Sequence, residues 1–246
     1  MNRVSIGIYA FVTSNWKELD YPLDLWLQWH RTQFDEISLI TYGKIELPDY
    51  DKTIVKVEEL NDFPTEKTFD FYVIGKMRAQ KNLTTDWKIL LDIDEFMFRP
   101  DLKSANKIYA YPLKYHNLYG SLEYEIKRKP YFANKQYRIH CDERIVTGDG
   151  ANVSSPYKNS IAPNVWHLGA ARNPVALRRK WIAQIRREFN EGYYVNTSRF
   201  EDIYKNGFDY EKYKDYIPDA LLKKSNLHAM PSILLENADR FSWWKP

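Results

Sequence analysis

The sequence holds one cysteine, no long apolar run and no large excess of charge of one sign. Because Cys141 is the single cysteine in 246 residues, no disulfide can form within the chain, and a reducing, cytoplasmic environment is expected. No apolar run approaches the length of a membrane span, and the β-branched N-terminal segment does not resemble a signal peptide. The formal net charge of +3, with basic and acidic residues interspersed, argues against nucleic acid as a partner.

Length and composition indicate a folded chain with a proper core. A chain of 246 residues with 44% hydrophobic content is long enough to form one domain. We expect a single domain over residues 1–246, with a nucleotide-binding half at 1–100, an acceptor and metal half at 101–190, and a helical C-terminal extension at 191–246.

Apolar periodicity predicts alternating strands and helices in the first hundred residues. Strands are expected at 4–12, 34–43, 53–57 and 89–91, with helices from about residue 16 to 33 and from 69 to 82. Such alternation predicts an α/β fold with a largely parallel sheet flanked by helices and joined by right-handed crossovers. The first, second and fourth strands should then end along one edge of the sheet.

Three carboxylates, Asp92, Asp94 and Glu95, directly follow the apolar strand at 89–91. Ligands bind at the carboxyl ends of strands in open α/β sheets, and alternate residues of an extended chain lie along one ridge. We expect Asp94 to project furthest past the strand end, with Asp92 nearer the ribose or a metal-bound water. Hard carboxylate oxygens suit Mg²⁺ or Mn²⁺ presented with a nucleotide diphosphate.

Two other interpretations of these carboxylates are open. The first is a solvated strand end, because carboxylates are common at surface turns. The second is an aspartate-nucleophile phosphotransferase, which is disfavoured because Glu95-Phe96-Met97 stands where a threonine would follow.

The segment at 85–96, Thr-Asp-Trp-Lys-Ile-Leu-Leu-Asp-Ile-Asp-Glu-Phe, resembles the Asp-x-Asp segment of family-2-like glycosyltransferases of the GT-A fold. The resemblance implies a Rossmann-like, mixed and mostly parallel sheet with a C-terminal helical segment. It implies that Mn²⁺, or Mg²⁺, is held by Asp94, Asp92 and a late histidine, His167. Imidazole nitrogen is a good third ligand for Mn²⁺.

The same resemblance assigns donor contacts and a general base. Lys76 occupies the place of a cation in the helix before the metal strand, and Arg172 follows His167 and could meet the diphosphate. The residues implied in binding the donor are Thr13, Lys76, Asp92, Arg172 and Lys180. Asp149, between Gly148 and Gly150, is the expected general base, with an ordinary Asp-Gly hairpin turn as the alternative.

The expected function is metal-dependent transfer of a sugar from a nucleotide-diphosphate sugar to a hydroxyl on a glycan or glycoconjugate, with inversion. The alternatives are a nucleotidyltransferase acting on sugar phosphates and a non-catalytic carbohydrate-binding relative. The basic residues of the helix after residue 173 are typical of a solvated helix face, with peripheral contact with the inner face of a membrane, beside an aromatic C-terminal tail, as the alternative. The basic residues concerned are Arg178, Arg179, Arg186 and Arg187.

Overall fold

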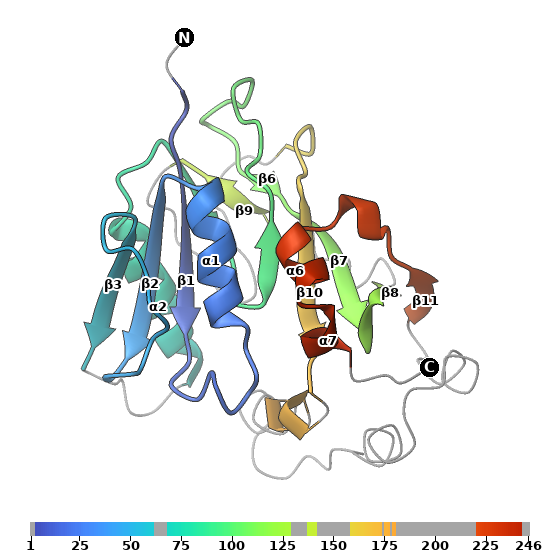
Figure 1. Cartoon of the computed structure of the whole chain (residues 1–246). Coiled ribbons are helices and arrows are strands. Elements are labelled where there is room, and N and C mark those ends of the chain that lie inside the picture. The colour runs from blue at the N-terminus through green and yellow to red at the C-terminus, as the bar shows by residue number, and fades with distance from the viewer. Residues whose placement is uncertain are drawn as a thin grey trace. The chain divides into compact units, whose positions relative to one another are not determined.

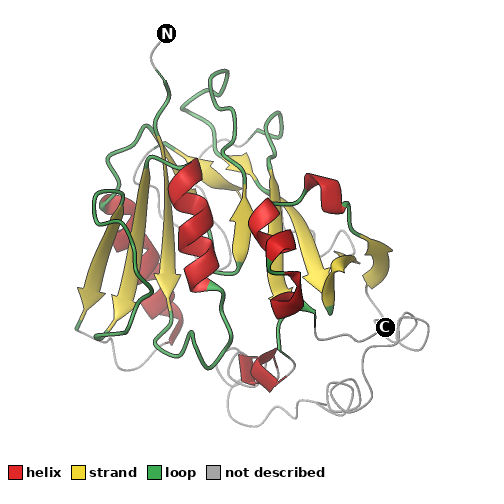
Figure 2. Ribbon diagram, in the orientation of Figure 1, coloured by secondary structure: helices red, strands yellow, loops and turns green. Residues whose placement is uncertain are grey.

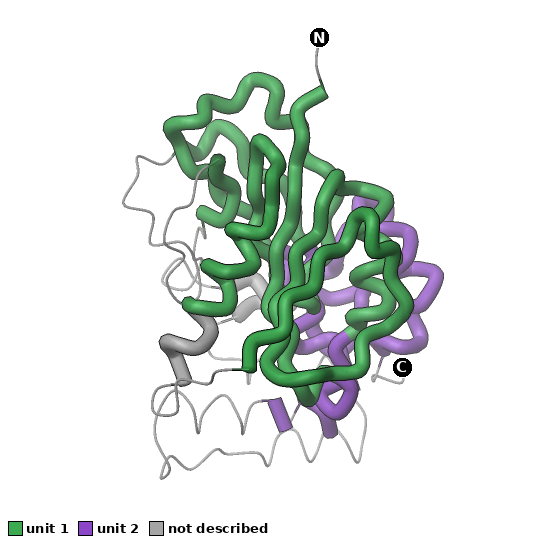
Figure 3. The backbone as a smooth tube through the Cα atoms, turned by 90° about the vertical axis from the view of Figure 1, so that its left-hand side faces the viewer, with its two compact units in different colours: residues 1–16, 22–115, 135–165 green, residues 17–21, 116–134, 166–246 purple. Residues whose placement is uncertain are grey.

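The computed structural model describes residues 3–61, 68–128, 137–141, 158–173, 175–177, 179–180 and 220–242. The chain forms two compact units, drawn in separate colours in Figure 3. Unit 1 comprises residues 1–16, 22–115 and 135–165, and unit 2 comprises residues 17–21, 116–134 and 166–246.

Unit 1 is built on a six-stranded sheet (Figure 1). Its strands are β1 (Ile6–Val12), β2 (Glu36–Tyr42), β3 (Val55–Leu60), β4 (Trp87–Leu90), β6 (Tyr111–Pro112) and β9 (Tyr137–His140). They lie in the order β3-β2-β1-β4-β9-β6. The first four are mutually parallel, whereas β9 runs antiparallel to both β4 and β6. The predicted mixed, mostly parallel sheet is therefore confirmed.

Two helices cover opposite faces of this sheet, with α1 (Leu23–Gln33) in front and α2 (Thr68–Lys81) behind in Figure 1. A helix links β1 to β2 and another links β3 to β4, which is the usual crossover between parallel strands, while β2 and β3 are joined by a loop. The side chains under α2 form a core cluster of Tyr9, Phe11, Ile40, Tyr42, Ala79, Leu83 and Leu90. A Cβ at Gly75 would come within 3.3 Å of the Phe11 ring, so glycine there lets α2 lie close to the sheet.

The first helix is shorter than the sequence pattern predicts. We expected it to begin near Trp16, but α1 begins at Leu23, directly after Pro22. The residue before a proline is disfavoured in the helical region, so Tyr21 cannot easily continue a helix into Pro22. Asp20 adopts a positive φ of 52°, which also interrupts any helix through this segment.

Unit 2 contains most of a second, largely antiparallel sheet. Strands β11 (Ala220–Lys224), β8 (Ser121–Arg128), β7 (Lys114–Tyr119) and β10 (Asn164–Ala170) are neighbours in that order. The C-terminal segment also contains a 3₁₀ turn at Leu227–Ala229 and two short helices, α6 (Ser232–Glu236) and α7 (Ala238–Phe241) (Figure 2). Helices were expected there, but strand β11, which pairs antiparallel with β8, was not.

The short strand β5 (Glu95–Met97) follows the carboxylate turn in unit 1 and is fully buried. The two sheets and the helices that flank the first of them confirm the predicted α/β class.

In the parts of the chain that the structure describes, no helix is long and apolar enough to cross a bilayer.

Candidate functional site

The order β3-β2-β1-β4 places a topological switch point between β1 and β4. From β1 the chain adds β2 and β3 on one side, and then returns to add β4 on the other side of β1. In doubly wound sheets the crevice for a ligand lies at such a point, outside the carboxyl ends of the strands. Thr13 directly follows β1 and Asp92 lies two residues after β4, so these two predicted donor-binding residues flank the switch point.

The Asp-x-Asp segment is a tight turn closed by its own residues. The backbone N–H of Glu95 donates to the carbonyl of Asp92 at 3.0 Å. In return the N–H of Asp92 donates to Oε2 of Glu95 at 2.9 Å. Glu95 therefore fixes the backbone from which Asp92 and Asp94 project.

Arg138 on β9 binds this turn from the side of the sheet. Its Nη1 donates to Oε2 of Glu95 at 2.7 Å and its Nη2 to Oδ2 of Asp92 at 3.3 Å. Burial alone would lower the pKa of Arg138, but the carboxylates of Glu95 and Asp92 and the Tyr115 hydroxyl raise it above its usual value. Arg138 thus stays charged and links both acids.

Tyr115 completes the buried side of the turn. Its hydroxyl is hydrogen-bonded to Glu95, and its ring lies 5.6 Å from the Arg138 guanidinium. Desolvation, together with the nearby carboxylates, raises the pKa of Tyr115 well above its ordinary value. The phenol is therefore neutral and serves as a hydrogen-bond donor to the carboxylate.

Lys76 on α2 reaches the same turn from the helical layer. Its Nζ lies 3.5 Å from Oδ1 of Asp92, and only 8% of its side chain is exposed. The structure therefore brings Lys76 and Asp92 together, two of the predicted donor-binding residues. The two oxygens of Asp92 face one cation each, Lys76 at Oδ1 and Arg138 at Oδ2.

The two aspartates differ in accessibility, and not as the sequence suggested. Asp94 is 2% exposed, whereas 39% of the Asp92 side chain is exposed. The expectation that Asp94 projects furthest is wrong, because the chain turns at Asp92 instead of continuing as an extended strand. The assignment of metal ligands itself stays a prediction.

The donor set suits a hard divalent cation that keeps most of its ligands as water and phosphate oxygens. The Asp92 side chain at the switch point is 39% exposed, and Mg²⁺ is commonly held by one or two carboxylates with substrate phosphates. Within the described residues, no group of three or more His, Cys, Asp or Glu side chains is arranged to hold a metal ion.

His167 lies on β10 in unit 2, where its ring orientation is fixed. Its Nδ1 is 3.0 Å from Oδ1 of Asn117, and because an amide oxygen only accepts, Nδ1 carries the proton. In the neutral ring Nε2 is then the basic nitrogen. A Cβ on Gly169 would come within 2.5 Å of the imidazole, so glycine at that position makes room for the ring.

Arg172 and Lys180, also in unit 2, share one aromatic contact. The Arg172 guanidinium lies 4.2 Å from the centre of the Tyr21 ring and donates to the carbonyl of Leu19 at 3.0 Å. Lys180 Nζ lies 5.2 Å from the same ring. Arg172 is 1% exposed, so its contacts tie residues 17–21 to the end of β10, and its predicted role toward a diphosphate stays a prediction.

The predicted base, Asp149, lies outside the described residues. Arg138 was not predicted as a site residue, because its contacts with Glu95 and Asp92 arise only from the pairing of β9 with β4. Two residues further along β9, His140 lies on the same face, and its Nε2 is hydrogen-bonded to the Tyr9 hydroxyl at 2.8 Å. Burial raises the pKa of Tyr9, which keeps that hydroxyl protonated.

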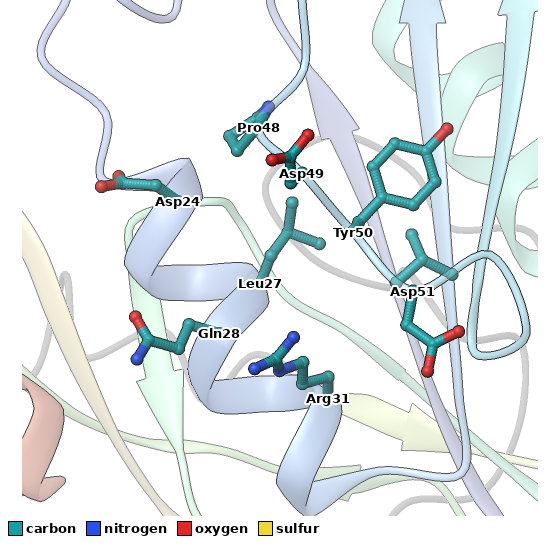
Figure 4. A pocket seen from close by; sticks show the side chains of 9 residues that line it. Asp24, Leu27, Gln28, Arg31, Pro48, Asp49, Tyr50 and Asp51 are labelled. Atoms are coloured by element: carbon teal, nitrogen blue, oxygen red, sulfur yellow. The ribbon is translucent and has the colours of Figure 1, made fainter.

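A separate pocket of about 270 Å³ lies between α1 and the chain leading into β3 (Figure 4). It is lined by Asp24, Leu27, Gln28, Arg31, Pro48, Asp49, Tyr50, Asp51 and Val55. These residues do not include any predicted site residue.

No protein-family model and no curated protein sequence matches the chain. Among solved structures, the chain is similar to S. aureus TarS residues 1–349, with TM-score 0.34 and 11% identity over 81% of this chain and 69% of that one. For the longer TarS chain the TM-score is 0.35 and the identity 12%, over 81% of this chain and 42% of that chain. For TarS 1–349 in complex with UDP the values are 0.34 and 11%, over 87% and 75%.

Proposed function

We propose that the protein transfers a sugar from a nucleotide-diphosphate sugar to a hydroxyl acceptor in a metal-dependent, inverting reaction. The observation that carries the proposal is the position of Asp92, an accessible carboxylate at the switch point of a Rossmann-like sheet with Lys76 beside it. A carboxylate and a cation together at this edge suit a ligand that brings a divalent ion and a diphosphate. The Asp-x-Asp resemblance at 92–94 agrees with that position.

The residues have distinct roles in this reaction. Asp92 and Asp94, with His167, would hold the divalent ion, while Thr13, Lys76, Arg172 and Lys180 would contact the donor. When bound, the ion neutralises the charge that develops on the departing diphosphate. Glu95, Arg138 and Tyr115 hold the carboxylate turn in place.

In the chemical step, an acceptor oxygen forms a bond to the anomeric carbon on the side opposite the diphosphate. The bond from that carbon to the phosphate oxygen breaks, and its electron pair leaves with the nucleoside diphosphate. Asp149 accepts the proton of the acceptor hydroxyl. Attack opposite the leaving group inverts the anomeric centre.

A thermal-shift screen tests the donor site. UDP, GDP, CDP, ADP and TDP are compared with and without Mn²⁺, and one of them should raise the melting temperature only when Mn²⁺ is present. Asp92→Asn, which keeps the shape and removes the charge, should lose that stabilisation. If no diphosphate stabilises the wild-type protein under any metal condition, the proposal is wrong.

The products of turnover separate the alternatives. A glycosyltransferase releases a nucleoside diphosphate from its sugar donor, whereas a nucleotidyltransferase releases pyrophosphate from a nucleoside triphosphate and a sugar phosphate. Nucleotidyltransferases usually carry a glycine-rich phosphate loop after the first strand, and Phe11-Val12-Thr13-Ser14-Asn15 contains no glycine. A carbohydrate-binding relative would release neither product.

A further inference from the structure

The two cations at Asp92 are anchored very differently. Arg138 binds Glu95 at 2.7 Å as well as Asp92 at 3.3 Å, and only 3% of its side chain is exposed. Lys76 lies 3.5 Å from Asp92, which is longer than an ordinary N–H···O hydrogen bond. If the charge of Asp92 were taken up elsewhere, Arg138 would keep Glu95 as its partner.

Within the described part of the chain, Lys76 makes no second ion pair of the kind that Arg138 makes with Glu95. Among the residues that the structure describes, Asp92 is its sole ion-pair partner, and 8% of the Lys76 side chain is exposed. A nearly buried ammonium is costly unless an anion compensates its charge. If Asp92 is engaged elsewhere, we expect the Lys76 ammonium to pair with another anion that comes within reach.

We propose that Asp92 is a shared counter-ion that makes binding of a divalent cation and binding of a diphosphate interdependent through Lys76. In the ligand-free protein Asp92 pairs with Lys76. Once Asp92 engages a divalent cation, Lys76 loses that partner and pairs with the diphosphate instead. This inference rests on the proposed function, because it takes the diphosphate site at the switch point as given.

A shared carboxylate has one consequence for binding of the cation and another for binding of the diphosphate. A divalent cation that arrives alone must compete with the Lys76 ammonium for Asp92, so Lys76 opposes binding of the cation. A diphosphate that arrives alone must compete with Asp92 for Lys76, so Lys76 contributes little until the cation is bound. Linkage requires that each ligand strengthens the other by the same factor.

The variant Lys76→Met removes the ammonium and keeps the length of the side chain. Mn²⁺ alone and inorganic pyrophosphate are the probes, since neither depends on the identity of the base or sugar. Without pyrophosphate, the affinity for Mn²⁺ should rise about 3- to 10-fold, as expected for removing one neighbouring positive charge. In EDTA the pyrophosphate affinity should change by less than about 2-fold, whereas in saturating Mn²⁺ it should fall at least about 10-fold.

Arg78→Met is the matched control. Arg78 lies on the same helix two residues away, is 59% exposed and pairs with Glu58 at 3.0 Å. The control removes the same charge from α2 without touching Asp92. Both affinities should stay within about 2-fold of wild type, because exposed charges are screened by salt.

Three outcomes would overturn the inference. Equal losses of pyrophosphate affinity with and without Mn²⁺, at unchanged Mn²⁺ affinity, would make Lys76 an ordinary phosphate contact. No change in any affinity would make it a structural residue. If the wild-type protein binds neither Mn²⁺ nor pyrophosphate, the proposed function fails as well, which distinguishes that result from the first two. Lys76→Gln replaces Lys76→Met if the latter does not fold.

Discussion

Arg138 and Glu95 form a buried ion pair, with Nη1 and Oε2 2.7 Å apart and the two side chains 3% and 2% exposed. The pair joins β9 to the carboxylate turn across 43 positions of sequence. Glu95 also accepts from the backbone N–H of Asp92, so this pair holds the turn from which the site is built.

Glu95→Gln should therefore destabilise the protein strongly. Removing one partner of a buried pair costs about 3–5 kcal/mol in the free energy of unfolding, because the buried Arg138 charge then keeps only its longer contact with Asp92, at 3.3 Å. Urea unfolding measures this loss. Lys107→Met is the control, because Lys107 and Asp86 form a pair whose side chains are 62% and 43% exposed, and its loss should cost about 0–1 kcal/mol. A loss below about 1 kcal/mol for Glu95→Gln would show that the pair does not hold the turn.

The buried histidine of α1 predicts a pH dependence of stability. His30 Nδ1 donates to the carbonyl of Trp26 at 2.9 Å, and Nε2 accepts from the N–H of Met97 at 3.4 Å, so the neutral ring has both nitrogens bonded. Burial lowers the pKa of His30 from 6.5 to about 3. Below pH 6.5 the unfolded chain therefore binds a proton that the folded protein does not.

The stability contributed by neutral His30 is complete above pH 6.5 and is lost as the pH falls from 6.5 toward 3. The slope approaches about 1.4 kcal/mol per pH unit. Urea unfolding between pH 7 and pH 5 should detect it, above the range in which most carboxylates titrate. His30→Gln should flatten the slope, whereas His228→Gln, at an exposed position, should leave it unchanged. An equal slope in His30→Gln would assign the effect to other groups.

The parallel sheet could be predicted because its signals are local. Apolar runs such as 89–91 and the alternation of strands with helices give the element types and the edge to which the carboxylates belong. Even the turn was within reach, since Glu95 bonds the backbone of Asp92 only three positions away. The role of Arg138 could not be predicted, because its partners lie 43 and 46 positions earlier and meet it only through the pairing of β9 with β4. The prediction that Asp94 projects furthest past the strand end was wrong for a related reason. It assumed an extended strand at 92–94, where the chain instead forms a turn.

Asp94→Ala should abolish metal-dependent nucleotide binding if Asp94 is the main carboxylate ligand. Neutralisation of charge by the ion contributes several kcal/mol, so transfer should fall at least about a thousandfold. Titration with Mn²⁺ in the presence of nucleoside diphosphate measures the binding. Because Asp94 is buried, Asp94→Asn should be measured beside it, with the exposed Asp101→Ala as the control. Unchanged titration in both Asp94 variants would leave Asp92 as the carboxylate that matters.

His167→Ala should weaken Mn²⁺ binding in the presence of nucleoside diphosphate, because it removes the proposed nitrogen ligand. Asn117→Leu should have a smaller effect of the same sign, about 10- to 100-fold, since the Asn117 amide accepts the Nδ1 proton and orients the ring. Isothermal titration at fixed nucleotide measures both, with His228→Ala as the control. Wild-type affinity in His167→Ala would make this histidine a structural residue of β10.

The identity of the general base is the last prediction of the proposed mechanism. An inverting displacement needs a carboxylate on the side of the sugar opposite the diphosphate. Asp92 and Asp94 are the proposed metal ligands, and Glu95 holds the turn through Arg138 and the Asp92 backbone. Asp149, flanked by two glycines, can approach a bound hydroxyl closely.

Asp149→Asn keeps the shape of the side chain and removes its basicity. Transfer should fall about 10²- to 10⁴-fold, while the affinity for nucleoside diphosphate with Mn²⁺ stays unchanged, because only the proton transfer is lost. Steady-state kinetics beside equilibrium binding separate the two quantities. Asp142→Asn and Glu143→Gln serve as comparisons, since either acid could face the acceptor from the neighbouring segment. If transfer survives in Asp149→Asn and disappears in one of these, that carboxylate is the base; if all three variants remain active, the inverting scheme is wrong.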